Sequence, residues 1–139
     1  MATFFFATLT HPKTNAITKL DVPKNGILVL GGNIDYGGEL TTNAKQVICR
    51  QNFITKIHAS EAILVDCVYN PITVIFAPKA IYIDCKSTSV EHLNLPIAKY
   101  IRCQYTPMAT IDAPNAVIID ARNAGLLKKV NAPKATVFR

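Results

Sequence analysis

The sequence predicts a β-rich solenoid, a stack of about seven 18-residue coils with a parallel sheet along one face. The first observation is that all four cysteines recur every 18 residues, at Cys49, Cys67, Cys85 and Cys103. One further step of 18 residues lands on Ala121, which takes the place of a fifth cysteine. The second and third are two further columns on the same period. Alanines stand five residues before these five register positions, at Ala44, Ala62, Ala80, Ala98 and Ala116, and β-branched residues stand two before them, at Val47, Val65, Ile83, Ile101 and Ile119. A fixed period of this kind is the signature of a repeat architecture.

The 139 residues are expected to form one domain, with residues 1–16 as an N-terminal cap and residues 17–139 as the repeats. The apolar stretch from Met1 to Leu9 lacks the basic region of a signal peptide, so it is interpreted as a buried first strand. No run approaches the roughly 18 apolar residues of a membrane span. These features predict a cytoplasmic protein, or one delivered into a host cell without a classical signal peptide.

Within each coil, the residues before the cysteine are expected to form a strand. Ile83 and Cys85 alternate across Asp84, and this period of two predicts a strand with one buried face. Ile75 and Ala77 also alternate, which allows a second, weaker strand in each coil.

The segments between the strands carry two further columns. Proline, as at Pro78, cannot donate to a ladder, so the return segment is expected to be extended or polyproline-like rather than helical. The asparagines Asn33, Asn52 and Asn70 are expected to hydrogen-bond the backbone of neighbouring coils.

The cysteines are predicted to be buried, reduced core thiols without a metal. Their shared register places them on the inward face of stacked strands about 4.8 Å apart, and no CxxC pair typical of a zinc site is present. Free thiols in the core indicate a reducing site of folding.

The repeat resembles the leucine-rich repeat, whose core segment reads LxxLxLxxNxL. The segment Ala62-x-x-Val65-x-Cys67-x-x-Asn70-x-Ile72 fits that pattern position by position, with Ala and Cys in two of the Leu positions. The short unit with proline on its return side is most similar to bacterial leucine-rich repeats, including those of secreted effector proteins. The resemblance implies an interaction module. A three-sided parallel β-helix is the alternative, although such coils usually have glycine at their corners.

No catalytic constellation is found, and the protein is predicted not to be an enzyme and to need no cofactor. The histidines His11, His58 and His92 occupy different columns, so stacking does not bring them together. The aspartates Asp66, Asp84 and Asp120 share one column and are expected to form an exposed ladder on the sheet, with Arg102 relieving their repulsion.

The exposed face of the parallel sheet is therefore the candidate site for a protein partner. Its predicted partner-binding residues form three rows: Leu64, Tyr82, Tyr100 and Ile118; Asp66, Asp84, Arg102 and Asp120; and Lys86 and Arg122, in a row that also holds Val68 and Gln104. Contiguous exposed apolar and aromatic residues are typical of interfaces. Nucleic acid is disfavoured despite the net charge of +6, because Tyr82 and Tyr100 adjoin an acidic column.

The alternative role is structural, with solenoids associating end to end as dimers or filaments. The sequence ends at Thr136-Val137-Phe138-Arg139, inside a predicted strand. Because a terminal coil exposes its apolar cross-section, we expect another copy or further sequence to cover it.

Overall fold

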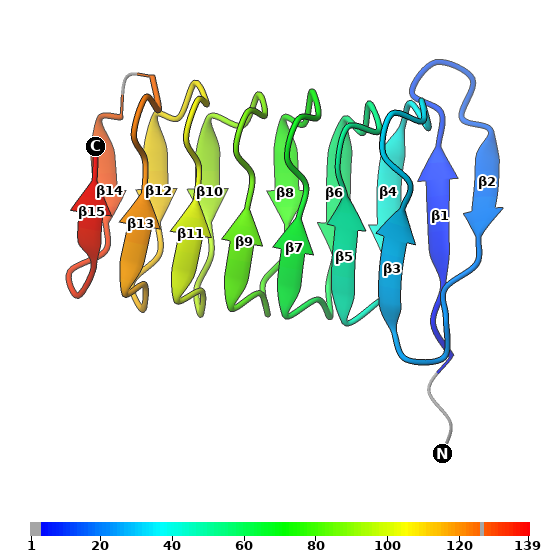
Figure 1. Ribbon diagram of the computed structural model, residues 1–139, viewed down its shortest axis with the longest axis horizontal. Helices are drawn as coiled ribbons and strands as arrows, with labels where there is room; N and C mark the ends of the chain where they lie inside the picture. Colours follow the sequence, from blue (N-terminus) through cyan, green and yellow to red (C-terminus); the bar gives the residue numbers. More distant parts are fainter. Residues whose placement is uncertain (1–3, 126) are drawn as a thin grey trace.

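The computed structural model describes residues 4–125 and 127–139, and it is a β-solenoid of stacked coils (Figure 1). Each described element is a short strand. The strands are β1 (Ala7–Thr10), β2 (Ile17–Leu20), β3 (Ile27–Leu30), β4 (Glu39–Thr42), β5 (Gln46–Cys49), β6 (Lys56–Ala59), β7 (Leu64–Asp66), β8 (Val74–Phe76), β9 (Tyr82–Asp84), β10 (His92–Asn94), β11 (Tyr100–Arg102), β12 (Thr110–Asp112), β13 (Ile118–Asp120), β14 (Lys129–Asn131) and β15 (Thr136–Phe138).

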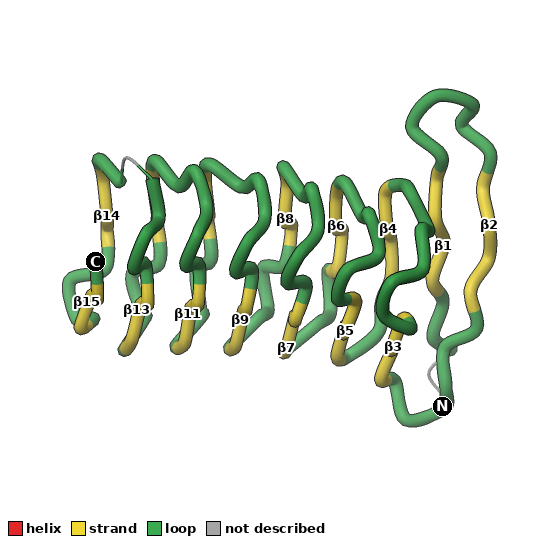
Figure 2. Tube along the Cα trace, turned by 45° about the horizontal axis from the view of Figure 1, so that its top comes forward, coloured by secondary structure: helices red, strands yellow, loops and turns green. Residues whose placement is uncertain are grey.

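The strands form two opposite faces, and each coil contributes one strand to each of them (Figure 2). The first face is a continuous parallel sheet of seven strands in the order β15-β13-β11-β9-β7-β5-β3. The second face holds a five-stranded sheet, β2-β1-β4-β6-β8, and a three-stranded sheet, β10-β12-β14. The predicted β-rich solenoid with a parallel sheet is thus confirmed, with two strands in a coil rather than the three of a three-sided β-helix.

The core between the two faces consists of the columns that the 18-residue period predicts. The cysteines, the alanines five residues earlier and the β-branched residues two residues earlier are all buried. The strands of the second face add a matching set of inward residues, namely Leu40, Ile57, Ile75, Leu93 and Ile111. Ile75 and Ala77 are both buried, so the second strand of each coil is confirmed.

The corner that leads from the second face to the first is a tight turn, which corrects the expectation of an extended return segment. In the coil of Pro78, the Ala80 N–H donates to the Ala77 carbonyl at 3.1 Å, and this places Pro78 at the second position of a four-residue turn. Proline suits that position because its ring presets φ near −65°. The proline column therefore starts the turn between the sheets.

The opposite corner, after each strand of the first face, needs one residue in the left-handed conformation. These residues recur every 18 positions with φ between 54° and 61°: Asn33, Gln51, Tyr69, Ser87, Tyr105 and Asn123. The first five of these residues donate their N–H to the carbonyl of a residue in the next coil, as Tyr69 does to Lys86 at 3.1 Å. The corner thus continues the ladder between coils.

Buried asparagines tie neighbouring coils together at this corner, as predicted for Asn52 and Asn70. The Asn70 Oδ1 atom accepts hydrogen bonds from the N–H groups of Asn52 (2.8 Å) and Ile54 (3.1 Å). Its Nδ2 group donates to three carbonyls, those of Cys49, Cys67 and Val68. Asn33 differs, because it is exposed and occupies the left-handed position itself. From Thr88 onward, threonine hydroxyls satisfy only a carbonyl of their own coil.

The N-terminal end is closed by an antiparallel hairpin of β1 and β2. β1 also pairs antiparallel with β4, so the parallel stacking runs from β3 and β4 onward, and residues 17–20 lie in the hairpin. The strand expected at Met1–Leu9 begins only at Ala7, where Ala7 and Leu9 are buried; Phe4 and Phe6 are exposed, and residues 1–3 lie outside the described residues. The Phe5 ring covers Gly26, whose missing side chain makes room for it.

The second face is interrupted between β8 and β10, where the described strands form no ladder. The interruption falls at the step where the corner residue changes from Asn70 to Thr88. There the Ser89 N–H donates to the Ile72 carbonyl at 2.9 Å. The first face continues across the same coils without a break, through β7 and β9.

At the C-terminal side, β14 and β15 are the last strands described. Their inward residues Val130 and Val137 are only partly buried, and Phe138 is 48% exposed. Residues 136–138 form the predicted strand. Coverage of this coil by another chain or by further sequence stays a prediction.

Candidate functional site

The first face presents an unbroken row of apolar and aromatic residues. Strand pairing places Leu64, Tyr82, Tyr100 and Ile118 directly beside one another in four successive coils. Tyr100 and Ile118 are exposed, and Leu64 and Tyr82 are half-buried. Just before these strands, Ile63, Ile81 and Val117 add exposed apolar side chains. We call these seven residues the apolar row.

The aspartate column beside the apolar row is not the exposed ladder that the sequence predicts. Asp66 and Asp84 are only 8% and 4% exposed, and Asp120 is partly buried. The column does pair in register, with Asp66 beside Asp84 and Arg102 between Asp84 and Asp120. The carboxylates lie beneath longer basic side chains, which cover them from solvent. The aspartates are therefore positioned to orient the basic side chains above them rather than to contact a partner.

Each aspartate in the column has an arginine partner. Arg50 donates to the Asp66 carboxylate through Nε (2.8 Å) and Nη2. Arg122 forms a two-pronged pair with Asp120, at 2.9 Å and 2.7 Å. Arg102 lies 3.6 Å from Asp84. The predicted role of Arg102, relief of repulsion among stacked carboxylates, agrees with this position.

Burial and ion pairing shift the pKa values of Asp84 and Asp120 in opposite directions. Burial raises the pKa of Asp84, against the lowering effects of the Lys86 N–H and of Arg102. The hydrogen bonds from Arg122 lower the pKa of Asp120. Asp84 is thus harder to ionise than Asp120, and one Asp66 oxygen beside it is buried without a hydrogen-bond partner in the described residues.

The third row splits between the surface and the core. Arg122 is exposed and Lys86 is half-buried, whereas Val68 and Gln104, in the intervening coils, are buried. In those two coils the next residue is exposed instead, and it is a tyrosine: Tyr69 or Tyr105. Sequence reasoning missed these two tyrosines because it considered only residues on the strand face.

The cysteines lack the properties of nucleophiles. Burial raises the pKa of both Cys49 and Cys103 to about 12, and it raises those of Cys67 and Cys85 as well. A thiol with so high a pKa contains almost no thiolate at neutral pH. The thiols therefore serve as small apolar side chains of the core.

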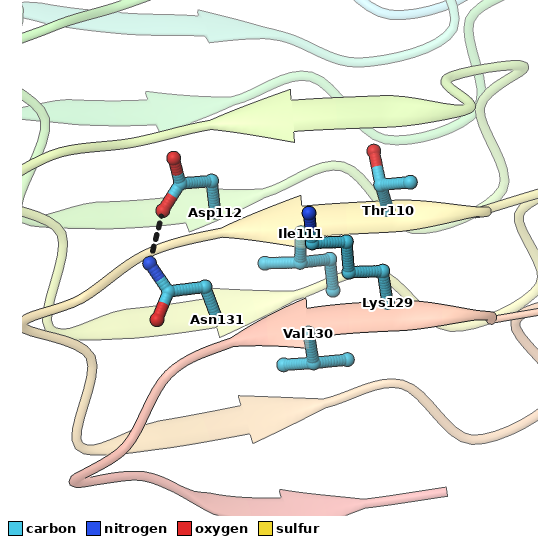
Figure 3. A pocket seen from close by; sticks show the side chains of 6 residues that line it. All are labelled: Thr110, Ile111, Asp112, Lys129, Val130 and Asn131. Carbon is cyan, nitrogen blue, oxygen red and sulfur yellow. Dashed lines mark hydrogen bonds between the residues drawn. The ribbon is translucent and has the colours of Figure 1, made fainter.

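The second face carries His58 and His92 on separate strands, and His11 lies in the turn of the β1–β2 hairpin. The His58 ring tilts against Phe76 with a centroid distance of 6.0 Å, and His92 shares a 2.7 Å hydrogen bond with Thr110. An open hollow lies over β12 and β14, where Asn131 donates to Asp112 at 2.9 Å (Figure 3). Among the described residues, no three His, Cys, Asp or Glu side chains are grouped as metal ligands would be. The described part of the chain also has no helix long and apolar enough to cross a membrane.

Comparison with protein-family models, with curated proteins and with solved structures found no match to this chain. Its geometry is therefore the basis for any functional assignment.

Proposed function

We propose that this protein is a non-enzymatic binding scaffold that presents its seven-stranded face to a protein partner. The observation that carries the proposal is the apolar row, whose seven residues come from four adjacent coils; the coil of Tyr100 contributes one residue, because Lys99 takes the second position there. Contiguous exposed apolar surface of this kind is rare on monomers without a binding role. Tyrosine and arginine side by side are also the residues that most often anchor interfaces.

The charged column supports the same proposal. Arg50, Arg102 and Arg122 keep 60%, 45% and 60% of their side chains exposed while they pair with the buried or partly buried aspartates of the column. An arginine that is already oriented loses less conformational entropy on binding. In this proposal the apolar row supplies affinity, and the arginines beside it supply orientation.

The sequence pattern, which resembles a leucine-rich repeat, supports a more specific proposal about the class of binding protein. We propose a short bacterial repeat protein of the effector type, whose partner binds across the parallel sheet. The continuous first face supports this proposal, because a rigid sheet can present several coils to one partner at once.

Affinity capture with matched variants tests the proposal. Three proteins are incubated with extracts of the source organism and of its host: the wild type, the double variant Tyr82→Ser/Tyr100→Ser and the control Val74→Ser/Phe76→Ser. The control removes exposed residues of the second face. We expect a protein that the wild type and the control retain and that the tyrosine variant loses. Its affinity is then measured with purified components. Identical recovery by all three proteins would rule out the first face.

Stability must be measured in parallel, because the test requires folded variants. We expect each tyrosine substitution to change the free energy of unfolding by about 1 kcal/mol or less. A larger loss would mean that the tyrosines belong to the core.

End-to-end association is the second candidate function, and it rests on the partly buried Val130 and Val137 and on the edges of β14 and β15. A free strand edge readily pairs with another chain. The test is the mass in solution across a concentration series. We expect the mass to rise for the wild type and to stay at that of the monomer for Val137→Asp; a mass independent of concentration would exclude this role.

A further inference from the structure

The corner that follows the first face carries an alternating row of cations and tyrosines. Five successive coils each place one large side chain there, in the order Arg50, Tyr69, Lys86, Tyr105 and Arg122. The cations stand one residue after the cysteine register, and the tyrosines stand two after it. In the tyrosine coils the residue at the cation position, Val68 or Gln104, is buried. We call these five residues the corner row; it has a period of two coils.

The tyrosines of the corner row occupy an unfavourable backbone conformation. Tyr69 and Tyr105 have φ of 57° and 56°, in the left-handed region, where a bulky side chain is uncommon. Asn33, Gln51, Ser87 and Asn123 fill the same position in other coils; of these residue types, asparagine tolerates the conformation best. The two tyrosines are 52% and 62% exposed, so packing does not explain them. Strained residues that persist at a surface indicate a functional demand.

The cations of the corner row are held in place and remain accessible. Asp66 and Asp120 occupy part of the guanidinium forks of Arg50 and Arg122, whose side chains stay 60% exposed. An arginine has five N–H donors, so donors remain for a ligand. The Lys86 ammonium lies 5.8 Å from the centre of the Tyr69 ring. A small hollow opens between Tyr105 and Arg122.

The spacing of the row defines the ligand. Neighbouring coils are separated by about 4.8 Å, so like residues of the corner row recur about every 10 Å. For each sugar ring, an extended polysaccharide advances by about the separation of neighbouring coils, and its apolar ring faces stack on aromatic side chains. A carboxylate on every second sugar would then meet a cation in one coil, where arginine can bind it in bidentate fashion. The uncharged sugar between would meet a tyrosine.

We propose that the corner row is a binding site for an extended acidic polysaccharide that carries a carboxylate on alternate sugars. Single-stranded nucleic acid fits less well, because every nucleotide is charged and a phosphate would face each tyrosine. The cations are also partly neutralised by Asp66 and Asp120 beneath them, which suits a polymer of lower charge density. The corner row shares Arg50 and Arg122 with the surface proposed for a protein partner, but its tyrosines lie outside the apolar row, so variants of the two sets of tyrosines distinguish the two proposals.

Binding of defined polymers tests the proposal. Oligosaccharides of hyaluronan, in which a carboxylated sugar alternates with a neutral one, serve as the probe in calorimetry at low salt. Polygalacturonate oligomers of equal length, charged on every sugar, uncharged cello-oligosaccharides and oligo-dT are the comparisons. We expect hyaluronan to bind at least tenfold more tightly than each of the others. Equal binding of all polyanions, preference for oligo-dT or for polygalacturonate, or no binding of hyaluronan would overturn the proposal.

The variants separate binding from folding. Tyr69→Asn/Tyr105→Asn removes both rings but suits the left-handed corner, so we expect unchanged or increased thermal stability with at least a tenfold loss of hyaluronan affinity. Tyr69→Phe/Tyr105→Phe keeps the rings and is expected to retain affinity within about twofold. Tyr82→Ser/Tyr100→Ser, on the sheet face, should bind hyaluronan like the wild type. Full affinity of the asparagine variant would overturn the proposal.

Discussion

The two faces of this solenoid are built from the same coils, but the hydrogen-bonded ladder between strands is continuous on only one of them. The first face is one parallel sheet of seven strands, whereas the second is interrupted between β8 and β10. The interruption lies between the coil that has Asn70 at its corner and the next coil, which has Thr88 at the equivalent position. Asn70 bridges two coils through both ends of its amide, while Thr88 bonds only the carbonyl of Cys85 in its own coil. The interruption therefore marks the end of the asparagine bridges, although β10 and β12 pair beside Thr106 without one.

The largest expected effect comes from removing the bridge itself. Asn70→Ala leaves two N–H groups and three carbonyls at the corner without their side-chain partner. Each buried polar group left unpaired costs about 1–3 kcal/mol, so we expect unfolding to become easier by about 4 kcal/mol in urea titration. The control Thr106→Ala loses one bond, to the Cys103 carbonyl, and is expected to cost about 1 kcal/mol. Equal losses of unfolding free energy in the two variants would show that the asparagine bridge stabilises the protein no more than the single threonine bond does.

The core that both faces share gives the next effect. Cys85 is fully buried, so Cys85→Ser introduces a hydroxyl without a matched partner, which costs about 1–3 kcal/mol. We expect Cys85→Ala to be less destabilising, because it removes only a small apolar atom. Chemical denaturation of the two variants measures the difference. Rapid labelling of three or more thiols in the native protein, or stoichiometric zinc, would contradict the description of these cysteines as reduced core residues.

The interruption itself can be repaired by a gain-of-contact variant. Thr88→Asn would offer the N–H groups of Asn70 and Ile72 the acceptor that Asn70 offers to Asn52 and Ile54. We expect slower amide hydrogen exchange in residues 91–94 and a gain of about 1 kcal/mol in the free energy of unfolding. Unchanged exchange in that segment would mean that the break has another cause. Residues 109–112, in the intact ladder of β12, serve as the internal reference.

The smallest effect concerns the charges of the first face. Burial raises the folded pKa of Asp84 above 3.8, so its ionisation opposes folding, and its contribution to stability improves as pH falls through that raised pKa. The lowered pKa of Asp120 has the opposite sign: its ion pair stabilises above pH 3.8, and the contribution is lost as pH falls through the lowered value. At pH 7 we expect Asp84→Asn to stabilise and Asp120→Asn to destabilise, each by roughly 0.5 kcal/mol.

Thermal unfolding from pH 7 to pH 3 checks these two signs. Both differences from the wild type should shrink at the acidic end, because protonation of Asp84 removes its burial penalty and because the contribution of Asp120 declines once the pH falls below the ordinary pKa of 3.8. Destabilisation by Asp84→Asn at pH 7 would instead mean that its pairing with Arg102 outweighs the cost of burying the charge.

The sequence allowed the core and the main strand to be predicted, because buried residues repeat with a strict period: Ile83 and Cys85 point inward as their alternation requires. Asp84 was expected to be exposed because it alternates with them, and that expectation was wrong because Arg102 of the neighbouring coil lies over the carboxylate. The pairing of residues 17–20 depends on a hairpin partner rather than on the repeat. Tyr69 and Tyr105 carry a 36-residue period that is visible in the sequence, but their left-handed backbone is not.

The two-coil period of the corner row restricts how the chain can change length. Deleting residues 68–85 removes one complete 18-residue coil and joins Cys67 to Lys86, which preserves every core column. The deletion would nevertheless set the coil of Arg50 directly beside that of Lys86 and would remove the tyrosine between them. Deleting 36 residues would keep the order of cations and tyrosines. The fold is therefore modular in units of one coil, whereas this surface is modular only in pairs, and insertions or duplications that keep it must come as double coils.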